Sequence, residues 1–164
     1  MEYGPNLLGN QVSDGSPFVI GCSPNPQVSA YLAFDAAGTG TWWASAVGST
    51  DGWLSVDFGV GNAKIVAKYE HTLYPEQNHC PDNWTFEGSN DNSNWDVLDT
   101  RTGQAQFYGT VKAYAFANST SYRYYRINIS KVGGTLGDVV IGINNLTMHE
   151  ALFLPSPFPT FHRA

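Results

Sequence analysis

Charged residues are scarce in this sequence. Only 13% of the 164 residues are charged, eight residues are Lys or Arg, and the formal net charge at pH 7 is -6. A surface of this composition has no basic field that would attract phosphate groups. We therefore expect no nucleic acid among the partners of this protein.

Long apolar runs and an export signal are also lacking. No segment approaches the roughly 18 consecutive apolar residues that a membrane-spanning helix needs. The first residues, MEYGPNLLGNQ, contain neither the basic region nor the apolar region of a signal peptide. The sequence therefore predicts no membrane span and shows no export signal.

Cysteines are few, and catalytic motifs are missing. Cys22 and Cys80 could form one disulfide, take part in a metal site or do neither, because the sequence does not place them within bonding distance. There is no Gly-x-Ser-x-Gly motif, no His-Glu-x-x-His motif and no Gly-rich phosphate loop. The acidic residues between 70 and 87 are expected to be solvated rather than paired as in a glycosidase. We expect no enzymatic activity.

Short aromatic and β-branched runs are abundant. In WLSVDF, Trp53, Ser55 and Asp57 alternate with apolar residues, and in RYYRINI the residues Tyr125 and Ile127 share one face. No window shows the period of a helix. The runs that we predict to be strands are 18–22, 53–59, 63–74, 83–89, 95–100, 112–117, 123–130 and 139–150.

These strands fit a single core, since a chain of this length makes one domain. About eight antiparallel strands, each with one buried face, predict an all-β protein with a jelly-roll β-sandwich over residues 1–150. Residues 151–164 are predicted to be an extended Pro-rich tail, because its prolines exclude a central strand. The tail is either a disordered stub or a docking segment that uses its large apolar side chains, which are Leu152, Phe153, Leu154, Phe158 and Phe161.

The polar run GSNDNSNW (88–95) predicts a tight hairpin, because Gly and Asn tolerate positive φ and Asn, Asp and Ser bond to their own backbone. This turn would let aromatic residues of the two flanking strands reach the core. We expect Trp43, Trp53 and Trp95 to pack in the core and Trp42 to face outward.

The order of several motifs identifies a family resemblance. AFDAAGTGTWWAS (33–45), GWLSVDFG (52–59), PDNWTFEGSNDNSNWDVLDT (81–100), YRYYRINIS (122–130) and IGINNLTMHE (141–150) resemble, in this order, the discoidin or coagulation-factor type C domain. The resemblance covers about residues 6–150, and Asn92 takes the place of the family's usual Gly in the hairpin. The family belongs to the galactose-binding-domain-like β-sandwiches, which include many carbohydrate-binding modules.

The resemblance implies a structural Ca²⁺ site. Relatives hold the ion with a loop like FDAAGTGT and an acidic residue near the last strand, which makes Asp35, Gly38 and Thr41 candidate ligands. The position of the acidic residue is taken by Asn145, a neutral oxygen donor. The alternative is that Asp35 bonds only to the amides of its own loop.

The resemblance also implies a sugar site at one end of the sandwich, where polar groups bind hydroxyls and an aromatic ring stacks on the sugar. The polar-aromatic loop 70–83 corresponds to the main binding loop of relatives, although it lacks their usual Arg. Segments 46–52 and 131–138 would flank the pocket. The loop could equally form an interface. The candidate ligand-binding residues are His71, Tyr74, Gln77, Asn78 and His79.

Two functions follow from these features. The first is a non-catalytic recognition domain that binds a glycan or glycoconjugate through the end loops, with weak sites that rely on avidity. The alternative is a structural subunit of an extracellular appendage or virion surface, which would assemble as a homo-oligomer or larger assembly through residues 152–164. Both functions predict an extracellular or virion location.

Overall fold

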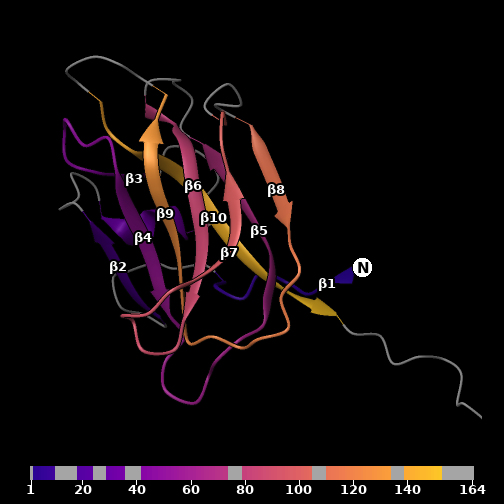
Figure 1. Cartoon of the computed structure of the whole chain (residues 1–164). Coiled ribbons are helices and arrows are strands. Elements are labelled where there is room, and N and C mark those ends of the chain that lie inside the picture. The colour runs from indigo at the N-terminus through magenta and orange to yellow at the C-terminus, as the bar shows by residue number, and fades with distance from the viewer. Residues whose placement is uncertain are drawn as a thin grey trace, which may run out of the picture.

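Two antiparallel sheets face each other in the computed structural model, which describes residues 2–9, 18–23, 29–35, 42–73, 79–104, 110–133 and 139–152 (Figure 1). The first sheet has the strand order β2-β4-β9-β6-β7. Its strands are β2 (Val19–Ser23), β4 (Gly52–Asp57), β6 (Pro81–Ser89), β7 (Asp96–Arg101) and β9 (Tyr124–Val132).

The second sheet has the order β1-β10-β5-β8, with β3 also paired to β10. Its strands are β1 (Glu2–Tyr3), β3 (Trp43–Ala44), β5 (Val66–Leu73), β8 (Val111–Ala115) and β10 (Gly142–Leu152). A short 3-10 turn, η1 (Ala30–Ala33), lies against β3 and β10. The predicted all-β sandwich is therefore confirmed, and each of the eight predicted runs contains or overlaps an observed strand.

The core lies between the sheets and follows the predicted alternation. Leu54 and Val56 of β4 and Tyr125, Ile127 and Ile129 of β9 are all buried. Trp43, Trp84 and Phe86 are also fully buried, as expected for residues of the core. Each such side chain stabilises the fold by about 1.5–3 kcal/mol through burial alone.

A chain of hydrogen bonds crosses this core from one sheet to the other. The indole Nε1–H of Trp84 in β6 donates to the hydroxyl of Tyr69 in β5 at 2.8 Å. The Tyr69 hydroxyl in turn donates to a carboxylate oxygen of Asp99 in β7, also at 2.8 Å. Burial raises the pKa of Tyr69 far above its usual value, so the hydroxyl keeps its proton and remains a donor.

Three short elements were not predicted from the sequence: β1, β3 and η1. The two strands have two residues each, which is too short to show a periodic pattern. At the other terminus, Ala151 and Leu152 were assigned to the tail but form the end of β10, where Leu152 pairs with Glu2 of β1. The remainder of the predicted tail lies outside the described residues.

The cysteines lie on separate parts of the first sheet. Cys22 is in β2 and Cys80 directly precedes β6, so β4 and β9 lie between them. Three strand spacings amount to about 14 Å, whereas a disulfide needs Cα atoms within about 7 Å. The two residues are not joined by a disulfide.

Across the described ranges, no helix is long and apolar enough to cross a membrane.

The predicted hairpin connects β6 and β7. Asn92 has a φ of 59°, the positive value that was expected at the position where the family usually has Gly. The carboxylate of Asp91 accepts hydrogen bonds from the Asn94 side chain and from the backbone N–H groups of Ser93 and Asn94. These bonds lower the pKa of Asp91, and the bond from the Asn94 side chain has the largest effect on that pKa.

Gly88 lies near the end of β6, just before the hairpin, and an aromatic ring covers its backbone. A Cβ atom at this position would lie 2.5 Å and 2.7 Å from ring carbons of Tyr122. The ring is held there by a hydrogen bond from the Tyr122 hydroxyl to Asp96 at 2.8 Å. The close approach of ring and backbone therefore requires Gly at position 88.

We predict that Gly88→Ala lowers the free energy of unfolding by about 1–3 kcal/mol, because the Tyr122 ring must move to admit the methyl group. Urea denaturation measures the change. Gly4→Ala is the matched control, since its Cβ would lie no nearer than 3.6 Å from other atoms. Equal stability of the Gly88→Ala protein and the control would show that the ring contact is not a packing constraint.

Candidate functional site

One end of the sandwich collects most of the connections that were predicted to bind a ligand. The strand pairs Gly52↔Ile129, Pro81↔Val132 and Ile143↔Leu73 place the starts of β4, β6 and β10 beside the ends of β9 and β5. The start of β8 and the end of β7 lie at the same end. We call it the loop end; it is at the top of Figure 1.

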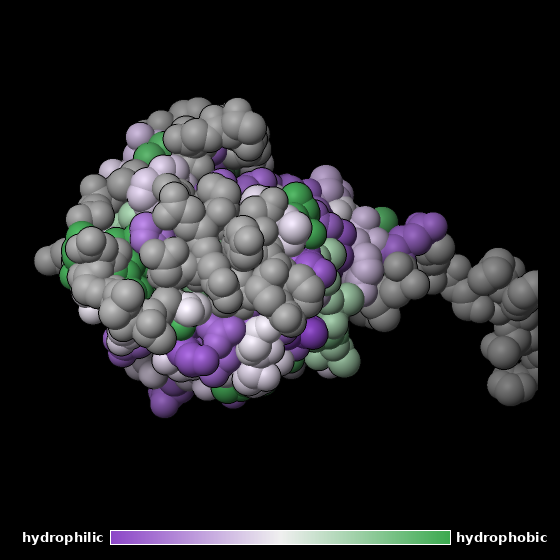
Figure 2. Space-filling model, turned by 90° about the horizontal axis from the view of Figure 1, so that it is seen from above, coloured by the Kyte–Doolittle hydropathy of each residue, from purple (hydrophilic) through white to green (hydrophobic). Residues whose placement is uncertain are grey.

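Hydrogen bonds between neighbouring connections hold the described part of the loop end together. Backbone N–H groups donate from Gly48 to the Val139 carbonyl at 2.7 Å and from Gly133 to the Cys80 carbonyl at 2.9 Å. Seen from above, the described residues around the centre are mostly hydrophilic or neutral, with smaller hydrophobic areas (Figure 2). Within the described residues, neighbouring connections at the loop end are therefore linked through their backbones.

His71 does not lie in a loop, contrary to its place in the predicted ligand set. It is in β5, only 1% exposed, and packs among aromatic rings. Its ring centroid is 4.9 Å from that of Trp84 and 5.2 Å from that of Tyr114. The prediction that His71 contacts a glycan is corrected on this ground, because two-residue alternation from inward-facing Tyr69 turns His71 inward as well.

Burial also determines the charge of His71. Desolvation lowers its pKa to about 3, so the imidazole is neutral at physiological pH. Both ring nitrogens are buried and have no hydrogen-bond partner among the described residues. The ring acts here as an aromatic core residue.

Two predicted residues from different sets lie beside each other. His71 and Asn145 both line a hollow of about 60 Å³ together with Glu70, Thr72, Val111 and Thr147. The hollow is large enough for a water molecule but not for a sugar ring. It therefore does not serve as the glycan site.

The remaining predicted ligand residues belong to the connection between β5 and β6. His79 is half-buried and directly precedes Cys80, while Tyr74, Gln77 and Asn78 lie outside the described residues. Beside this connection, the Lys131 ammonium forms an ion pair with buried Asp82 at 2.6 Å, and the Lys131 side chain is 61% exposed. The Lys131 ammonium is therefore a charged donor at the loop end.

Two residues of the predicted metal site, Asp35 and Asn145, belong to the described part of the structure. Asp35 is 8% exposed and follows η1, which contacts β10. The chain then returns to β3, where Trp43 pairs with Ile143, the residue just before Asn144 and Asn145. Gly38 and Thr41 lie outside the described residues. Both η1 and β3, the elements that precede and follow residues 36–41, therefore contact β10.

The side-chain oxygens of Asn144 and Asn145 are of the type that a hard cation prefers. The Oδ1 atoms of Asn144 and Asn145 are buried without a hydrogen-bond partner among the described residues, and the carboxylate-bearing Asp35 is also buried. Within the described ranges, no three His, Cys, Asp or Glu side chains come together. A cation would therefore depend on amide and carbonyl oxygens. Asn144, which the sequence analysis missed, adjoins the register shift between Ile143 and Asn145.

Two tryptophans differ from their predicted positions. Trp53 and Trp95 were expected in the core, but both are half-buried and line a hollow on the outer face of the first sheet. The alternation in β4 explains the outcome for Trp53, which shares its face with Ser55 and Asp57. Trp42 is half-buried beside fully buried Trp43.

The family resemblance is confirmed by a direct sequence comparison. A family model of the NedA-like, galactose-binding F5/F8 type C domain matches residues 32–127, which is more than half of the chain. The chain belongs to this family. No curated protein sequence matches it.

Solved structures of the same architecture are carbohydrate-binding modules. Chitosan-binding module 1 of a chitosanase/glucanase from Paenibacillus sp. IK-5 has a TM-score of 0.67 at 23% identity, over 88% of this chain and 98% of the module. The family 32 module of Streptococcus pneumoniae EndoD has a TM-score of 0.68 at 11% identity, over 90% and 100%.

A third similar structure contains a sugar. The family 32 module of Clostridium perfringens NanJ, solved in complex with galactose, has a TM-score of 0.63 at 19% identity, over 81% of this chain and 93% of the module. These identities establish the shared fold. The names describe binding modules, in agreement with the expectation that the chain is not an enzyme.

The buried His71 predicts a pH-dependent stability. Unfolded His binds a proton below about pH 6.5, whereas folded His71 stays neutral down to a pKa of about 3, so stability falls as the pH falls through this window. Between pH 7 and pH 5 the loss is about 2 kcal/mol.

His71→Phe keeps an aromatic ring in the cluster and removes this titration. We expect urea denaturation to show a smaller loss of stability between pH 7 and pH 5 for the variant than for the natural protein. Carboxylates titrate alike in both proteins, so the difference isolates His71. Identical losses in the two proteins would mean that His71 is protonated in the folded state.

Proposed function

We propose that this protein is a non-catalytic module that binds a glycan or glycoconjugate at the loop end. The family to which the chain belongs carries this proposal, since it is a family of galactose-binding domains. The similar structures support it, because their names refer to chitosan and to galactose. Glycans of this kind are displayed mainly outside cells, so we propose an extracellular location.

The proposed contacts come from the connection between β5 and β6. Tyr74 would stack on the apolar face of a sugar ring, and Gln77, Asn78 and His79 would bind its hydroxyls. The Lys131 side chain beside this connection is 61% exposed, and its ammonium, which pairs with Asp82, supplies a further donor. His71 is left out of this set because its ring is enclosed in the core.

A site formed by these few side chains would bind its ligand weakly. Several copies on one surface or one polypeptide would raise the overall affinity through effective concentration. Assembly through the Pro-rich tail is the weaker candidate function, since the solved structures described above are named as carbohydrate-binding modules.

A structural Ca²⁺ ion is proposed beside the loop end. Asp35 and the backbone carbonyls of Gly38 and Thr41 would hold it with the side-chain oxygen of Asn145, and the buried oxygen of Asn144 is the added donor. The ion would fix the path of the loop after η1. It would take no part in binding chemistry.

Thermal unfolding tests the ion. We expect Ca²⁺ to raise Tm and EDTA to lower it, because an ion that binds only the folded state adds about 2.7 kcal/mol at a hundred times its Kd. Asp35→Asn should abolish the response, whereas Asp51→Asn, at an exposed carboxylate, should retain it. A Tm that ignores both Ca²⁺ and EDTA would remove the ion from the proposal.

A glycan array with the protein displayed as a multimer tests the sugar site. Galactose and chitosan oligosaccharides are the first probes, and we expect a saturable signal from at least one class of glycan. The double variant Tyr74→Ala/Asn78→Ala should weaken that signal about tenfold, through loss of one stacking and one hydrogen-bonding contact.

Val60→Ala is the control for this experiment. Val60 is 81% exposed and lies in the turn between β4 and β5, at the end opposite the loop end. Its substitution should leave the signal unchanged. An array without any signal would refute glycan binding, and a signal that survives the double variant would place the site elsewhere.

A further inference from the structure

The outer face of the first sheet has a groove that the proposed function does not use. Two adjoining hollows of about 140 and 180 Å³ share Trp53 and Asn92. The first is completed by Trp95 and Arg126, and the second extends across the sheet to Tyr124. We call the two together the sheet-face groove. Each hollow is several times the roughly 30 Å³ that a water molecule occupies in the liquid.

The strand register explains why the sheet is hollowed here. Gly21 of β2 pairs with Ser55 of β4, and Ser55 pairs with Arg126 of β9. The small residues Gly21 and Ser55 therefore form a low row between the larger Trp53 and Tyr124. A groove between aromatic walls is the result.

Gly21 also fixes the orientation of one wall. A Cβ atom at Gly21 would lie 3.0 Å and 3.2 Å from Cζ3 and Cη2 of Trp53, so the indole lies over the bare backbone of β2. The ring is thus held against the sheet before any ligand arrives. Pre-organised aromatic surfaces lose little conformational entropy on binding.

Charges along the groove are neutralised within the protein. The guanidinium of Arg126 pairs with the buried carboxylate of Glu87 and stacks 4.1 Å from the ring centroid of Trp95. Arg123 makes two hydrogen bonds to Asp57, which lines the other hollow. Neither arginine presents an unpaired positive charge, so the groove favours a ligand without net charge.

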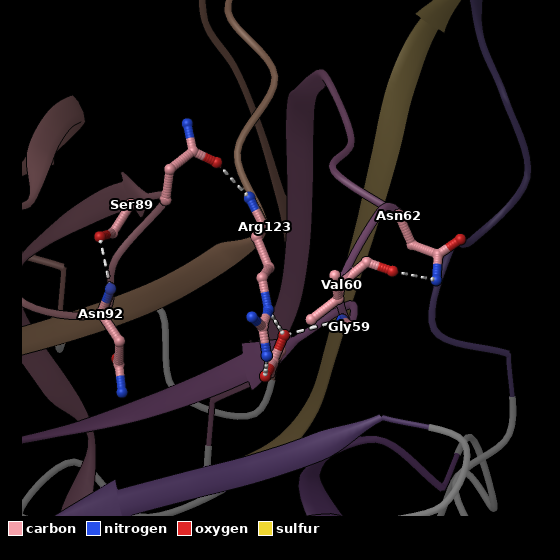
Figure 3. Close-up of polar contacts among 8 residues, drawn as sticks. Gly59, Val60, Asn62, Ser89, Asn92 and Arg123 are labelled. Carbon is pink, nitrogen blue, oxygen red and sulfur yellow. Dashed lines mark hydrogen bonds and ion pairs between the residues drawn. The ribbon is translucent and has the colours of Figure 1, made fainter.

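Hydrogen-bonding groups remain available beside the aromatic rings. The Asn92 side chain is exposed, and Figure 3 shows its amide extending away from the bond between its backbone and Ser89. Arg126 uses only its Nε–H toward Glu87 among the described residues, which leaves its terminal N–H groups. Indole faces next to neutral amide and N–H donors match a sugar ring, which has an apolar C–H face and a rim of hydroxyls.

The position of the groove argues against a peptide bound as an added strand. It lies over β4 and β9, each of which has a paired strand on both sides. Gly21 of the edge strand β2 also lines the groove, but a strand added to that edge would lie in the plane of the sheet, beside the groove and not in it.

We propose that the sheet-face groove is a second binding site, for a segment of a neutral, linear oligosaccharide. The chain would lie across β4 and β9 with one ring against Trp53 and the next beside Trp95. Asn92 and Arg126 would bind its hydroxyls. This site is separate from the loop end and does not depend on the proposed function there.

The indole N–H signals of the five tryptophans in an NMR spectrum test the proposal, with maltohexaose, laminarihexaose and cellohexaose as probes. We expect at least one probe to shift the Trp53 and Trp95 signals saturably, with no shift of buried Trp84. Trp95→Ala should raise Kd about tenfold, the loss of one aromatic contact.

Asn92→Gly is the second variant, because Gly accepts the φ of 59° and only the amide is removed. It should raise Kd several-fold while stability is kept. Val111→Ala, at an exposed position of the other sheet, is the control and should bind normally. Binding should also survive Tyr74→Ala/Asn78→Ala, which separates this site from the loop end.

Three outcomes would overturn the proposal. The first is the absence of any shift with all three neutral probes. The second is a shift that persists unchanged in both Trp95→Ala and Asn92→Gly. The third is a shift of the same indole signals with protein concentration alone, which would assign the groove to contacts between copies of the chain.

Discussion

The hydrogen bond from Trp84 to Tyr69 determines how the two sheets face each other. It joins β6 to β5 inside an apolar core, where an unpaired hydroxyl or indole N–H would be costly. Tyr69 must therefore point inward, and its ring stacks on Phe86 at a centroid distance of 4.3 Å. Because side chains alternate along a strand, this one orientation also sets the faces of the neighbouring residues in β5.

The same alternation divides polar groups between core and surface. In β5 it sends His71 inward to the aromatic cluster, and it leaves Lys68 and Glu70 to form an ion pair on the outer face. In β4 it buries Leu54 and turns Trp53 outward. An outward tryptophan is unusual on a solvated sheet face, and the sheet-face groove forms around it.

The sequence predicted the strands and the hairpin well because both depend on local patterns. Alternation is visible in WLSVDF, and Asn92 has the positive φ that turn chemistry requires. The sequence was a poorer guide to which side chains face the core. His71 follows from the orientation of Tyr69, a tertiary contact, whereas Trp53 was already marked as outward by its polar neighbours. The register that sets Gly21 beside Ser55 joins segments far apart in the chain, so no local pattern reveals the groove.

The pairing of β1 with the last residues of β10 governs how such a module can be connected. Glu2 lies opposite Leu152, so the first and last described strands are adjacent, and these two residues lie at the end of the sandwich opposite the loop end (Figure 1). Inserted into a larger protein, the sandwich would be attached through these two adjacent strands at one end only. The loop end would then point away from the parent structure.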